Sequence, residues 1–361
     1  MRIGIDAREI VARQTGVGRH LSGLLAEWQA SGATRVHQFV LYAHGTIPNL
    51  PDGFATTIVP GPPGTWWQQV RLPRAAAADR LDVFFSPQYS APLGLKTKTV
   101  VVLYDVSFAA RPEWFRFREG VRLRWLSRAS AARACAVITI SRFSRAEIVE
   151  YLNVPESRIH VIPPGVPVRP AGAAGEREPK VLFVGSIFNR RHVPDLISAA
   201  ARVVRRHPAV SLDLVGDNRS YPHEDVLAAI EREQLGARIT WHRYASDEQL
   251  AGLYARARAF VFLSEYEGLG LTPLEALTAG VPPVLFDTAV SHETCGDAAL
   301  YVARDRPRDL ERAIEQVLFD PEVRARLLAA APATLTQFSW SRAARETLAV
   351  LEDCARPAGR S

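Results

Sequence analysis

The chain has 361 residues, of which 47% are hydrophobic and 23% are charged. These are the values of a folded globular protein, and they exclude disordered and collagen-like chains. The length predicts two domains. No apolar run approaches the ~20 residues that span a bilayer, and the N-terminus lacks the apolar core of a signal peptide. We therefore expect a cytoplasmic protein.

Cysteine usage leads to the same expectation. The three cysteines, Cys135, Cys295 and Cys354, lie far apart in the chain and form no C-x-x-C pair. This spacing gives no zinc pattern, and we expect the thiols to be reduced, as in the cytosol.

The net charge of +6 is distributed unevenly along the chain. Residues 1–170 hold 21 basic and 12 acidic residues, a balance of +9. Residues 171–361 hold 23 basic and 26 acidic residues, a balance of −3. We expect the first part to be the one that faces an anionic partner.

One segment of the first part combines arginines with large aromatic side chains. It contains Trp114, Phe115, Phe117 and Trp125, and also Arg116, Arg118, Arg122, Arg124 and Arg128. A basic, aromatic helix can lie on an anionic surface, so the segment predicts peripheral contact with the inner face of the membrane. The alternative is a helix that packs in the core and leaves its arginines solvated.

The first half of the chain alternates strand-like and helix-like segments. Apolar runs rich in β-branched and aromatic residues predict strands over 2–7, 38–43, 56–60, 82–86, 99–105, 136–141 and 159–163. Helices are predicted between them, over 17–29, 67–78, 113–132 and 142–152. This alternation indicates a parallel sheet with helices on both faces.

A stretch rich in Pro, Gly and Ala over 163–179 predicts an interdomain linker. A second series of strands follows, over 180–185, 211–216, 238–244, 259–264 and 283–287, again with helices between them. We therefore predict an N-terminal Rossmann-like domain over 1–170 and a second Rossmann-like domain over 171–337. Residues 338–361 are predicted as a C-terminal helix that packs back toward the first domain.

The most informative motif lies after the predicted strand 259–264. Gly268 and Gly270 keep the turn free of side chains, so that a ligand can approach the backbone. Leu269 and Leu271 complete this turn. Glu267 precedes the following helix, where a carboxylate has no evident structural duty, so it is a candidate catalytic residue.

The helix after this turn is predicted to begin at Thr272, an N-cap residue that Pro273 follows. Backbone amides at a helix N-terminus bind anions. Thr272 and Glu275 also have the spacing of a capping box, which needs no ligand. For Glu275 the sequence therefore leaves two interpretations open, a ligand contact at the helix start and a capping box.

A second candidate site follows the predicted strand 180–185. Ser186 comes directly after this strand, and Arg190 and Arg191 lie a few residues further on. Guanidinium groups suit bidentate contact with phosphate. The alternative is a solvated pair of arginines before a helix.

The first domain offers two weaker candidates. Gly16 and Gly18 open the first predicted helix, but Leu21 stands where the dinucleotide fingerprint needs a glycine, so NAD binding is not supported. Tyr104 and Asp105 end the predicted strand 99–105, a position where polar side chains bind ligands in this architecture. The alternative for Asp105 is a helix cap or a loop hydrogen bond.

Together these motifs resemble glycosyltransferase family 4, a family of retaining enzymes with the GT-B fold, and within it the mannosyltransferase-like branch of bacterial polysaccharide and O-antigen assembly. In the first half the matching residues are Ile3-Gly4-Ile5-Asp6-Ala7-Arg8, Gly16-Val17-Gly18-Arg19, Phe85-Ser86-Pro87 and Ile140-Ser141-Arg142-Phe143-Ser144. In the second half they are Phe183-Val184-Gly185-Ser186, Arg190-Arg191-His192 and the E-x7-E motif that Glu267 and Glu275 form.

The resemblance implies two Rossmann-like domains that face each other across a cleft, the first, over 1–170, on the side of the acceptor and the second, over 171–337, binding the nucleotide sugar. It implies transfer of a sugar from a nucleoside-diphosphate sugar to a saccharide, lipid-linked or small-molecule acceptor, with no cofactor and no nucleic-acid partner. The sequence has no D-x-D pair, and this absence together with Arg190 and Arg191 predicts that the reaction needs no metal. Glu275 is implied on the nucleotide ribose and Glu267 near the donor sugar. Arg190 and Arg191 are implied on the diphosphate, and the glycine loop at Gly16 close to it.

The chain departs from the family pattern at three positions. Tyr104 stands where the family commonly has His, Arg191 where it has Lys, and Arg243 where it usually has Gly. A non-catalytic sugar-nucleotide-binding partner of a polysaccharide assembly system is therefore the alternative function. A sugar-nucleotide epimerase also has two such domains, but the E-x7-E motif argues against it.

Overall fold

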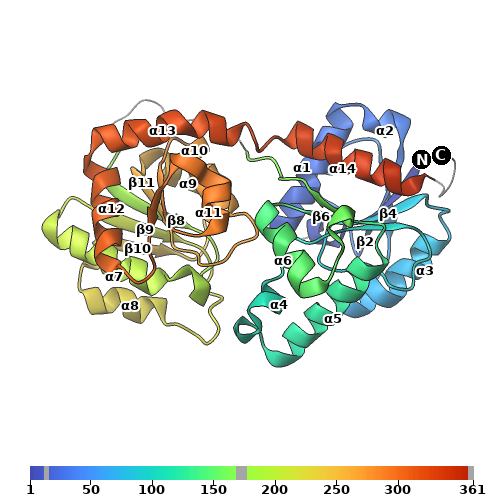
Figure 1. The fold of residues 1–361 in the computed structure, drawn as a ribbon, viewed down its shortest axis with the longest axis horizontal. Coiled ribbons are helices and arrows are strands. Elements are labelled where there is room, and N and C mark those ends of the chain that lie inside the picture. Colours follow the sequence, from blue (N-terminus) through green and yellow to red (C-terminus); the bar gives the residue numbers. More distant parts are fainter. Residues whose placement is uncertain (12–15, 168–176, 357–361) are drawn as a thin grey trace. The chain divides into compact units, whose positions relative to one another are not determined.

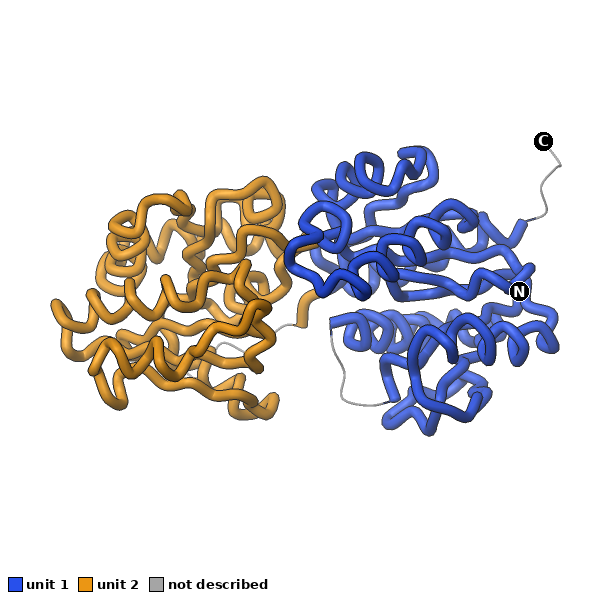
Figure 2. Tube along the Cα trace, turned by 90° about the horizontal axis from the view of Figure 1, so that it is seen from below, with its two compact units in different colours: residues 1–165, 338–361 blue, residues 166–337 orange. Residues whose placement is uncertain are grey.

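The computed structural model describes residues 1–11, 16–167 and 177–356. The chain forms two compact units, one of residues 1–165 together with 338–361 and one of residues 166–337 (Figure 2). The chain therefore returns to the first unit after it completes the second. The predicted boundary at 170 and much of the predicted linker lie outside the described residues.

Unit 1 is built on a seven-stranded sheet in the order β3-β2-β1-β4-β5-β6-β7. Every neighbouring pair in this sheet is parallel. The strands are β1 (Arg2–Asp6), β2 (Gln38–Ala43), β3 (Phe54–Ile58), β4 (Val83–Ser86), β5 (Thr99–Val102), β6 (Ala136–Thr139) and β7 (Ile159–Val161). Strands β4 and β5 are buried along their whole length, as expected for a sheet that is covered on both faces.

Helices cover both faces of this sheet (Figure 1). They are α1 (Gly16–Ala30), α2 (Ala33–Val36), α3 (Leu72–Ala77), α4 (Ser107–Ala110), α5 (Phe117–Arg133), α6 (Arg142–Leu152) and α14 (Trp340–Ala355). A π-helical turn, Trp67–Arg71, precedes α3. The C-terminal helix α14 packs against α1 and against β4, β5 and β6.

The packing of α14 depends on two residues that lie far from it in the sequence. The indole Nε1 of Trp28 donates a hydrogen bond of 2.9 Å to the carbonyl oxygen of Ala344. Trp340 lies over Gly165, where an added Cβ would come within 2.2 Å of the indole ring. A larger residue at position 165 would therefore displace the start of α14.

A disulfide joins Cys135, which directly precedes β6, to Cys354 of α14. The expectation that all three cysteines are reduced thiols is therefore wrong for this pair. Their distance in the sequence concealed the contact, because the pairing arises only when α14 packs back onto the sheet of unit 1. Cys295 is buried and is not part of a disulfide.

Unit 2 has a six-stranded sheet in the order β10-β9-β8-β11-β12-β13, again with only parallel pairs. The strands are β8 (Lys180–Val184), β9 (Ser211–Val215), β10 (Ile239–His242), β11 (Ala259–Phe262), β12 (Pro283–Phe286) and β13 (Leu300–Val302). The short edge strand β13 was not predicted. The helices are α7 (Val193–Arg206), α8 (Val226–Glu233), α9 (Asp247–Arg256), α10 (Leu271–Thr278), α11 (Ala289–Cys295), α12 (Pro307–Phe319) and α13 (Pro321–Leu335).

The predicted α/β class with two doubly wound parallel sheets is confirmed. Each sheet has a point at which the strand order reverses, between β1 and β4 in unit 1 and between β8 and β11 in unit 2. Ligands of such sheets bind beyond the carboxyl ends of the strands at this switch point. Within the described ranges, no helix has the length and apolar character needed to cross a bilayer.

Candidate active site

The strongest candidate residues meet at the switch point of unit 2. Residues 185–192 follow β8 and residues 263–270 follow β11, and these two strands are hydrogen-bonded neighbours. Gly185 has a φ of +149°, and an added Cβ would lie 2.7 Å from the guanidinium of Arg191. A glycine at the end of β8 is thus what allows Arg191 to fold back over the strand.

Arg191 and Glu267 form an ion pair. Both Nε and Nη2 of Arg191 lie 2.8 Å from Oε1 of Glu267, and Nη1 donates to the carbonyl oxygen of Ser186 at 2.8 Å. The hydroxyl of Ser264 donates to the same carboxylate oxygen at 2.8 Å. Both charged side chains are largely buried, and the guanidinium lies over the ring of Phe262. The expectation that Glu267 has no structural duty is therefore wrong.

The pairing fixes the charge state of the site. Burial alone would raise the pKa of Glu267, but the guanidinium groups of Arg191 and Arg190 and the Ser264 hydrogen bond outweigh it and hold the pKa below its usual value of 4.5. Burial lowers the pKa of Arg191, and Glu267 opposes this shift. At neutral pH the carboxylate is therefore ionised beside a charged guanidinium.

Arg190 differs from its neighbour. Its guanidinium lies over the ring of Phe188, 4.3 Å from the centroid, and its carbonyl oxygen accepts a hydrogen bond from the amide of Glu265. The two arginines thus hold the loops after β8 and β11 together in different ways. The following residue, His192, has a φ of +46° and contacts Asp195 at 3.0 Å.

Helix α10 begins one residue before the predicted Thr272 cap. Its N-cap is Gly270, with a φ of +87°, and no side chain caps the helix. The predicted capping box of Thr272 and Glu275 is therefore absent, because Thr272 already lies inside the first turn. Its hydroxyl is buried without a hydrogen-bond partner among the described residues. Glu275 is buried on α10, and the amides of the first turn have no intrahelical acceptor.

The remaining turn residues surround this helix start. Leu269 is buried, and its carbonyl oxygen accepts a hydrogen bond from the hydroxyl of Thr294. Gly268 lies next to it, and Leu271 is the first residue of α10. Arg243, at the end of β10, stacks over Trp241 at 4.8 Å, and the indole of Trp241 donates to the carbonyl oxygen of Gly216.

The candidate residues of unit 1 form a separate group. Tyr104 is buried, and its hydroxyl contacts Nδ1 of His20 at 2.8 Å and donates to the carbonyl oxygen of Pro87 at 3.2 Å. Burial raises the pKa of Tyr104 above its usual range and lowers the pKa of His20 to about 4. These are the contacts of a neutral pair in the core.

Asp105 accepts hydrogen bonds from the hydroxyl of Tyr89 at 2.8 Å and from the amide and hydroxyl of Ser107. This is the loop hydrogen-bonding alternative, and it leaves the predicted catalytic role untested. Gly16 opens α1 and Gly18 lies in its first turn, whereas residues 12–15 lie outside the described residues.

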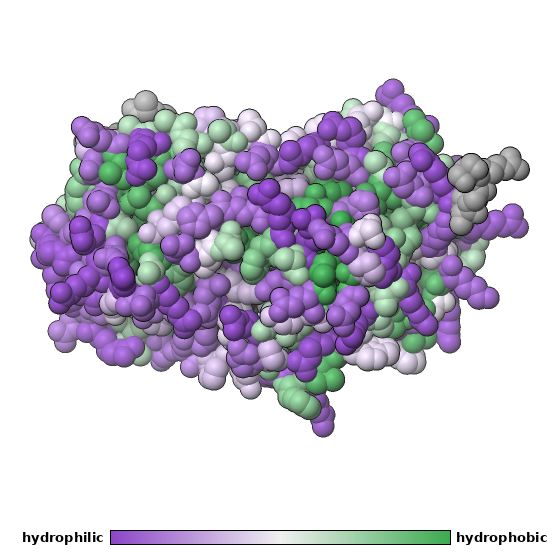
Figure 3. Space-filling model, in the orientation of Figure 1, coloured by the Kyte–Doolittle hydropathy of each residue, from purple (hydrophilic) through white to green (hydrophobic). Residues whose placement is uncertain are grey.

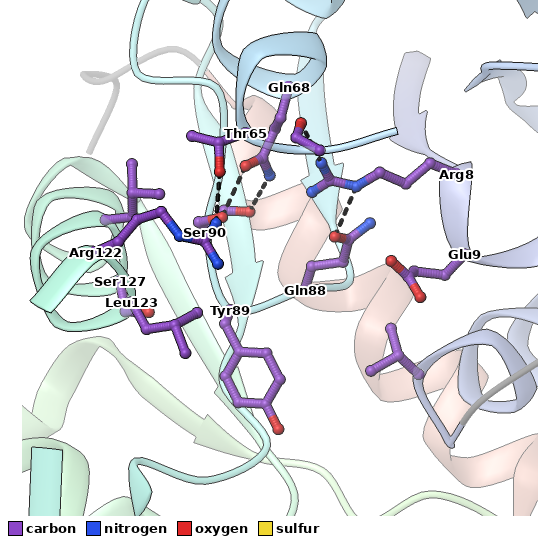
Figure 4. A pocket seen from close by; sticks show the side chains of 13 residues that line it. Arg8, Glu9, Thr65, Gln68, Gln88, Tyr89, Ser90, Arg122, Leu123 and Ser127 are labelled. Carbon is purple, nitrogen blue, oxygen red and sulfur yellow. Dashed lines mark hydrogen bonds between the residues drawn. The ribbon is translucent and has the colours of Figure 1, made fainter. Parts of the chain in front are cut away.

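Unit 1 also holds a cavity of about 270 Å³ that the sequence did not reveal (Figure 4). It lies at the switch point of this sheet, because Arg8 and Glu9 follow β1 and Gln88, Tyr89 and Ser90 follow β4. The sequence could have indicated this cavity, because both of these polar segments directly follow predicted strands that are neighbours in the sheet. No group of three or more metal-ligating His, Cys, Asp or Glu side chains occurs in the described part of the chain, and metal independence remains a prediction.

Two glycosyltransferase family models match the chain, one in each half. The model of Glycosyltransferase Family 4 matches residues 14–170, and the model of Glycosyl transferases group 1 matches residues 168–334. The two matches together cover residues 14–334, and the chain is a glycosyltransferase.

Its relatives agree with this assignment. This glycosyltransferase is 28% identical over 288 residues to O-antigen chain mannosyltransferase B of Escherichia coli, an alignment that covers 74% of this chain and 73% of the relative.

Solved structures show the same GT-B fold. Sucrose-phosphate synthase from Thermosynechococcus elongatus superposes with a TM-score of 0.78 over 98% of both chains at 18% identity. Anabaena Alr3699/HepE, solved in complex with UDP and glucose, superposes with a TM-score of 0.76 over 98% of this chain and 100% of that chain at 17% identity.

Proposed function

We propose that this glycosyltransferase moves a sugar, mannose or a close relative, from a nucleoside diphosphate to a saccharide or lipid-linked acceptor, with retention of anomeric configuration and without a metal. The observation that carries the proposal is the buried Arg191–Glu267 pair at the switch point of unit 2, beside the start of α10. The mannosyltransferase relative from Escherichia coli supports the choice of sugar.

The chemistry follows from the charge that develops during transfer. As the bond between the sugar C1 and the phosphate oxygen breaks, negative charge grows on the diphosphate. Arg190, Arg191 and the backbone amides at the start of α10 stabilise that charge. Glu267 orients Arg191 through the ion pair, so it acts as a positioning residue for the diphosphate as well as a partner for the donor sugar. Glu275 binds the ribose.

Retention without a covalent enzyme nucleophile implies attack from the face that the diphosphate leaves. The acceptor oxygen forms its bond to C1 on that face, and its proton passes to the departing phosphate oxygen. The bond to the phosphate breaks with both electrons on that oxygen, so charge and atoms balance. This route needs no covalent enzyme nucleophile.

Replacement of Arg191 tests the proposal. Arg191→Ala should cost about 2–4 kcal/mol of transition-state stabilisation. Arg191→Lys should retain more activity than Arg191→Ala, because lysine keeps the positive charge. It should remain less active than the wild type, because lysine lacks the planar guanidinium that contacts both Glu267 and the carbonyl oxygen of Ser186. Arg232→Ala, on the exposed face of α8, is the matched control. Equal kcat/KM for the three position-191 proteins would contradict the proposed role.

A thermal-shift screen tests the donor, and a turnover assay tests the metal requirement. Binding of the correct GDP-, UDP- or ADP-sugar at 100 times its Kd should add about 2.7 kcal/mol of stability. Turnover should persist in EDTA. Turnover that EDTA abolishes and Mg²⁺ or Mn²⁺ restores would rule out the metal-independent mechanism.

The alternative is a sugar-nucleotide-binding protein without catalysis. The contact of the Tyr104 hydroxyl with His20 in the core favours it, because this hydroxyl is occupied where the family commonly has a donor-sugar contact. A protein that binds a nucleotide sugar but neither hydrolyses it nor transfers its sugar to acceptor extracts would support the alternative.

The proposal includes peripheral contact of α5 with an anionic membrane. Phe117, Val121 and Trp125 are 82%, 41% and 62% exposed. Their spacing of four residues places them on one side of the helix, and Arg118, Arg124 and Arg128 lie close to that side in the helical register. Arg122 instead lines the cavity of unit 1. In Figure 3, apolar and charged side chains lie next to one another over the lower part of unit 1, the region that Figure 1 labels α4 and α5.

A further inference from the structure

We infer that Cys135 and Cys354 form a reversible thiol–disulfide exchange site, and that its reduction by a dithiol releases helix α14 from the rest of unit 1 and lowers transfer activity. The disulfide joins two residues with a sequence separation of 219. Its effect on activity rests on the proposed function, whereas the exchange site and the release of α14 are argued from unit 1 alone.

The disulfide lies where a small thiol can reach it. Cys135 and Cys354 are both partly exposed, whereas Cys295 is buried and outside any disulfide. Cys354 belongs to the last turn of α14, and helix ends open more readily than helix centres. Exposed disulfides are the ones that external thiols reduce most easily. The partial exposure therefore gives a dithiol access to this bond.

The exchange runs in two steps. A thiolate of the dithiol attacks Sγ of Cys354, the disulfide bond breaks, and its electron pair passes to Sγ of Cys135, which takes up a proton. The second thiolate of the reagent attacks the mixed disulfide and releases Cys354, which is protonated in turn. The protein gains two electrons and two protons, and the dithiol becomes a disulfide. Sγ of Cys135 lies 3.4 Å from the carbonyl oxygen of Thr99, which can accept the hydrogen of the new thiol.

The packing of α14 is weak apart from the disulfide. The helix has 16 residues and buries five of them, namely Ala343, Ala344, Thr347, Val350 and Leu351. Helix α7 is two residues shorter and buries eight. The hydroxyl of Thr347 is buried without a hydrogen-bond partner among the described residues, which counts against docking. A small apolar face with an unsatisfied hydroxyl leaves much of the attachment to the disulfide.

The other contacts at the same end of α14 are polar and lie near the surface. Oε1 of Glu352 lies 3.1 Å from Nε2 of His37, and the Glu352 side chain is 41% exposed. Nζ of Lys98 donates a hydrogen bond to the carbonyl oxygen of Arg356. Exposed ion pairs contribute little to stability. The disulfide is therefore the main link between the last turn of α14 and the sheet.

The first turn of α14 contacts the helix that carries candidate residues of unit 1. Helix α14 packs along α1 (Figure 1), and Trp340 fills the space beside Gly23 of α1. The ring of Trp340 lies 6.1 Å from the ring of His20, and Nδ1 of His20 contacts the Tyr104 hydroxyl at 2.8 Å. Because secondary elements open as cooperative units, release of α14 removes the support of Trp340 from α1, the helix that Gly16 opens.

The test measures hydrogen–deuterium exchange of the full chain before and after treatment with dithiothreitol. We expect reduction to speed exchange of the α14 amides at least tenfold and to leave the α7 amides unchanged. Cys135→Ser/Cys354→Ser should exchange at the faster rate with and without dithiothreitol. His37→Ala removes the ion pair at the same end of α14 but keeps the disulfide, so it should retain the response. Oxidised glutathione should restore slow exchange in the reduced wild type.

Transfer activity is the second readout. Reduction should lower kcat/KM of the wild type by about fivefold or more, and oxidised glutathione should restore it. Cys135→Ser/Cys354→Ser should have the activity of the reduced wild type in both conditions. Titration of the thiols before and after dithiothreitol establishes that the disulfide has been reduced.

The outcomes separate this inference from the proposed function. Equal exchange of the α14 amides in oxidised and fully reduced wild type, or a disulfide that dithiothreitol does not reduce, would overturn the exchange site. Faster exchange of α14 with unchanged transfer would overturn the control of activity. Redox-dependent exchange of α14 in a protein that transfers no sugar in either state would support the exchange site and count against the proposed function.

Discussion

At the residue scale, Glu267→Gln removes the charge that compensates the buried Arg191 guanidinium. An amide oxygen can still accept hydrogen bonds, so we expect a loss of about 1–3 kcal/mol in the free energy of unfolding rather than loss of the fold. We also expect kcat to fall at least tenfold, which corresponds to about 1.4 kcal/mol. Glu265→Gln, in the same loop but paired with Arg304, is the control. Normal turnover in Glu267→Gln would remove this carboxylate from the mechanism.

The same variant has a distinctive pH dependence. Since the folded pKa of Glu267 lies below its usual value of 4.5, its stabilising contribution is complete above that value and is lost as the pH falls through the folded pKa. The stability difference between wild type and Glu267→Gln, measured by urea unfolding, should therefore stay constant from about pH 7 down to about pH 4.5 and shrink as the pH falls from there to about pH 3. A difference that stays constant over this range would contradict the ion-pair explanation.

At the scale of single elements, Gly216 at the end of β9 is a position that only glycine can occupy. Its φ is +144°, and an added Cβ would lie 2.0 Å from the carbonyl oxygen of Gly185. Gly216→Ala should destabilise the protein by at least about 2 kcal/mol. It should also weaken nucleotide-sugar binding, because the substitution displaces the backbone at Gly185, and the segment that follows Gly185 carries Arg191. Gly94→Ala, where an added Cβ meets nothing within 4 Å, should leave stability nearly unchanged.

Helix α5 has two chemically different faces, one that lines the cavity of unit 1 and one that exposes Phe117 and Trp125. The protein should float with vesicles that contain phosphatidylglycerol at low salt and dissociate at high salt, because each basic residue contributes about 1 kcal/mol at an anionic surface. Phe117→Ser/Trp125→Ser should reduce binding at least tenfold. Ile58→Ser, another exposed apolar position of unit 1, should not change it. No lipid-dependent binding of the wild type would contradict the membrane proposal.

At the scale of the whole molecule, α14 follows unit 2 in the sequence but belongs to unit 1, and the Cys135–Cys354 disulfide ties it there. The disulfide closes a loop with a sequence separation of 219 residues, and its reduction should cost about 2–5 kcal/mol. Dithiothreitol should therefore lower the melting temperature of the wild type. Cys135→Ala/Cys354→Ala should already melt at the lower temperature and show no further response. Equal melting with and without reductant in the wild type would refute this stabilising role.

The sequence by itself determined the class of fold and the family. Apolar runs that alternate with amphipathic helices predict parallel strands with helices on both faces, because burial imposes that pattern locally. The Glu267–Glu275 motif and the arginines after β8 could likewise be recognised, since each follows a buried strand. The edge strand β13 escaped prediction because its residues are few and only partly buried.

Only the tertiary structure decided how the candidate side chains pair. The hydrogen bonds between Arg191 and Glu267 and between His20 and Tyr104 join residues 76 and 84 positions apart. The disulfide and the cavity of unit 1 likewise combine distant segments. Such contacts depend on strand order, on register and on which loops meet at a switch point. These are properties of the packed sheet, and no local periodicity in the sequence encodes them.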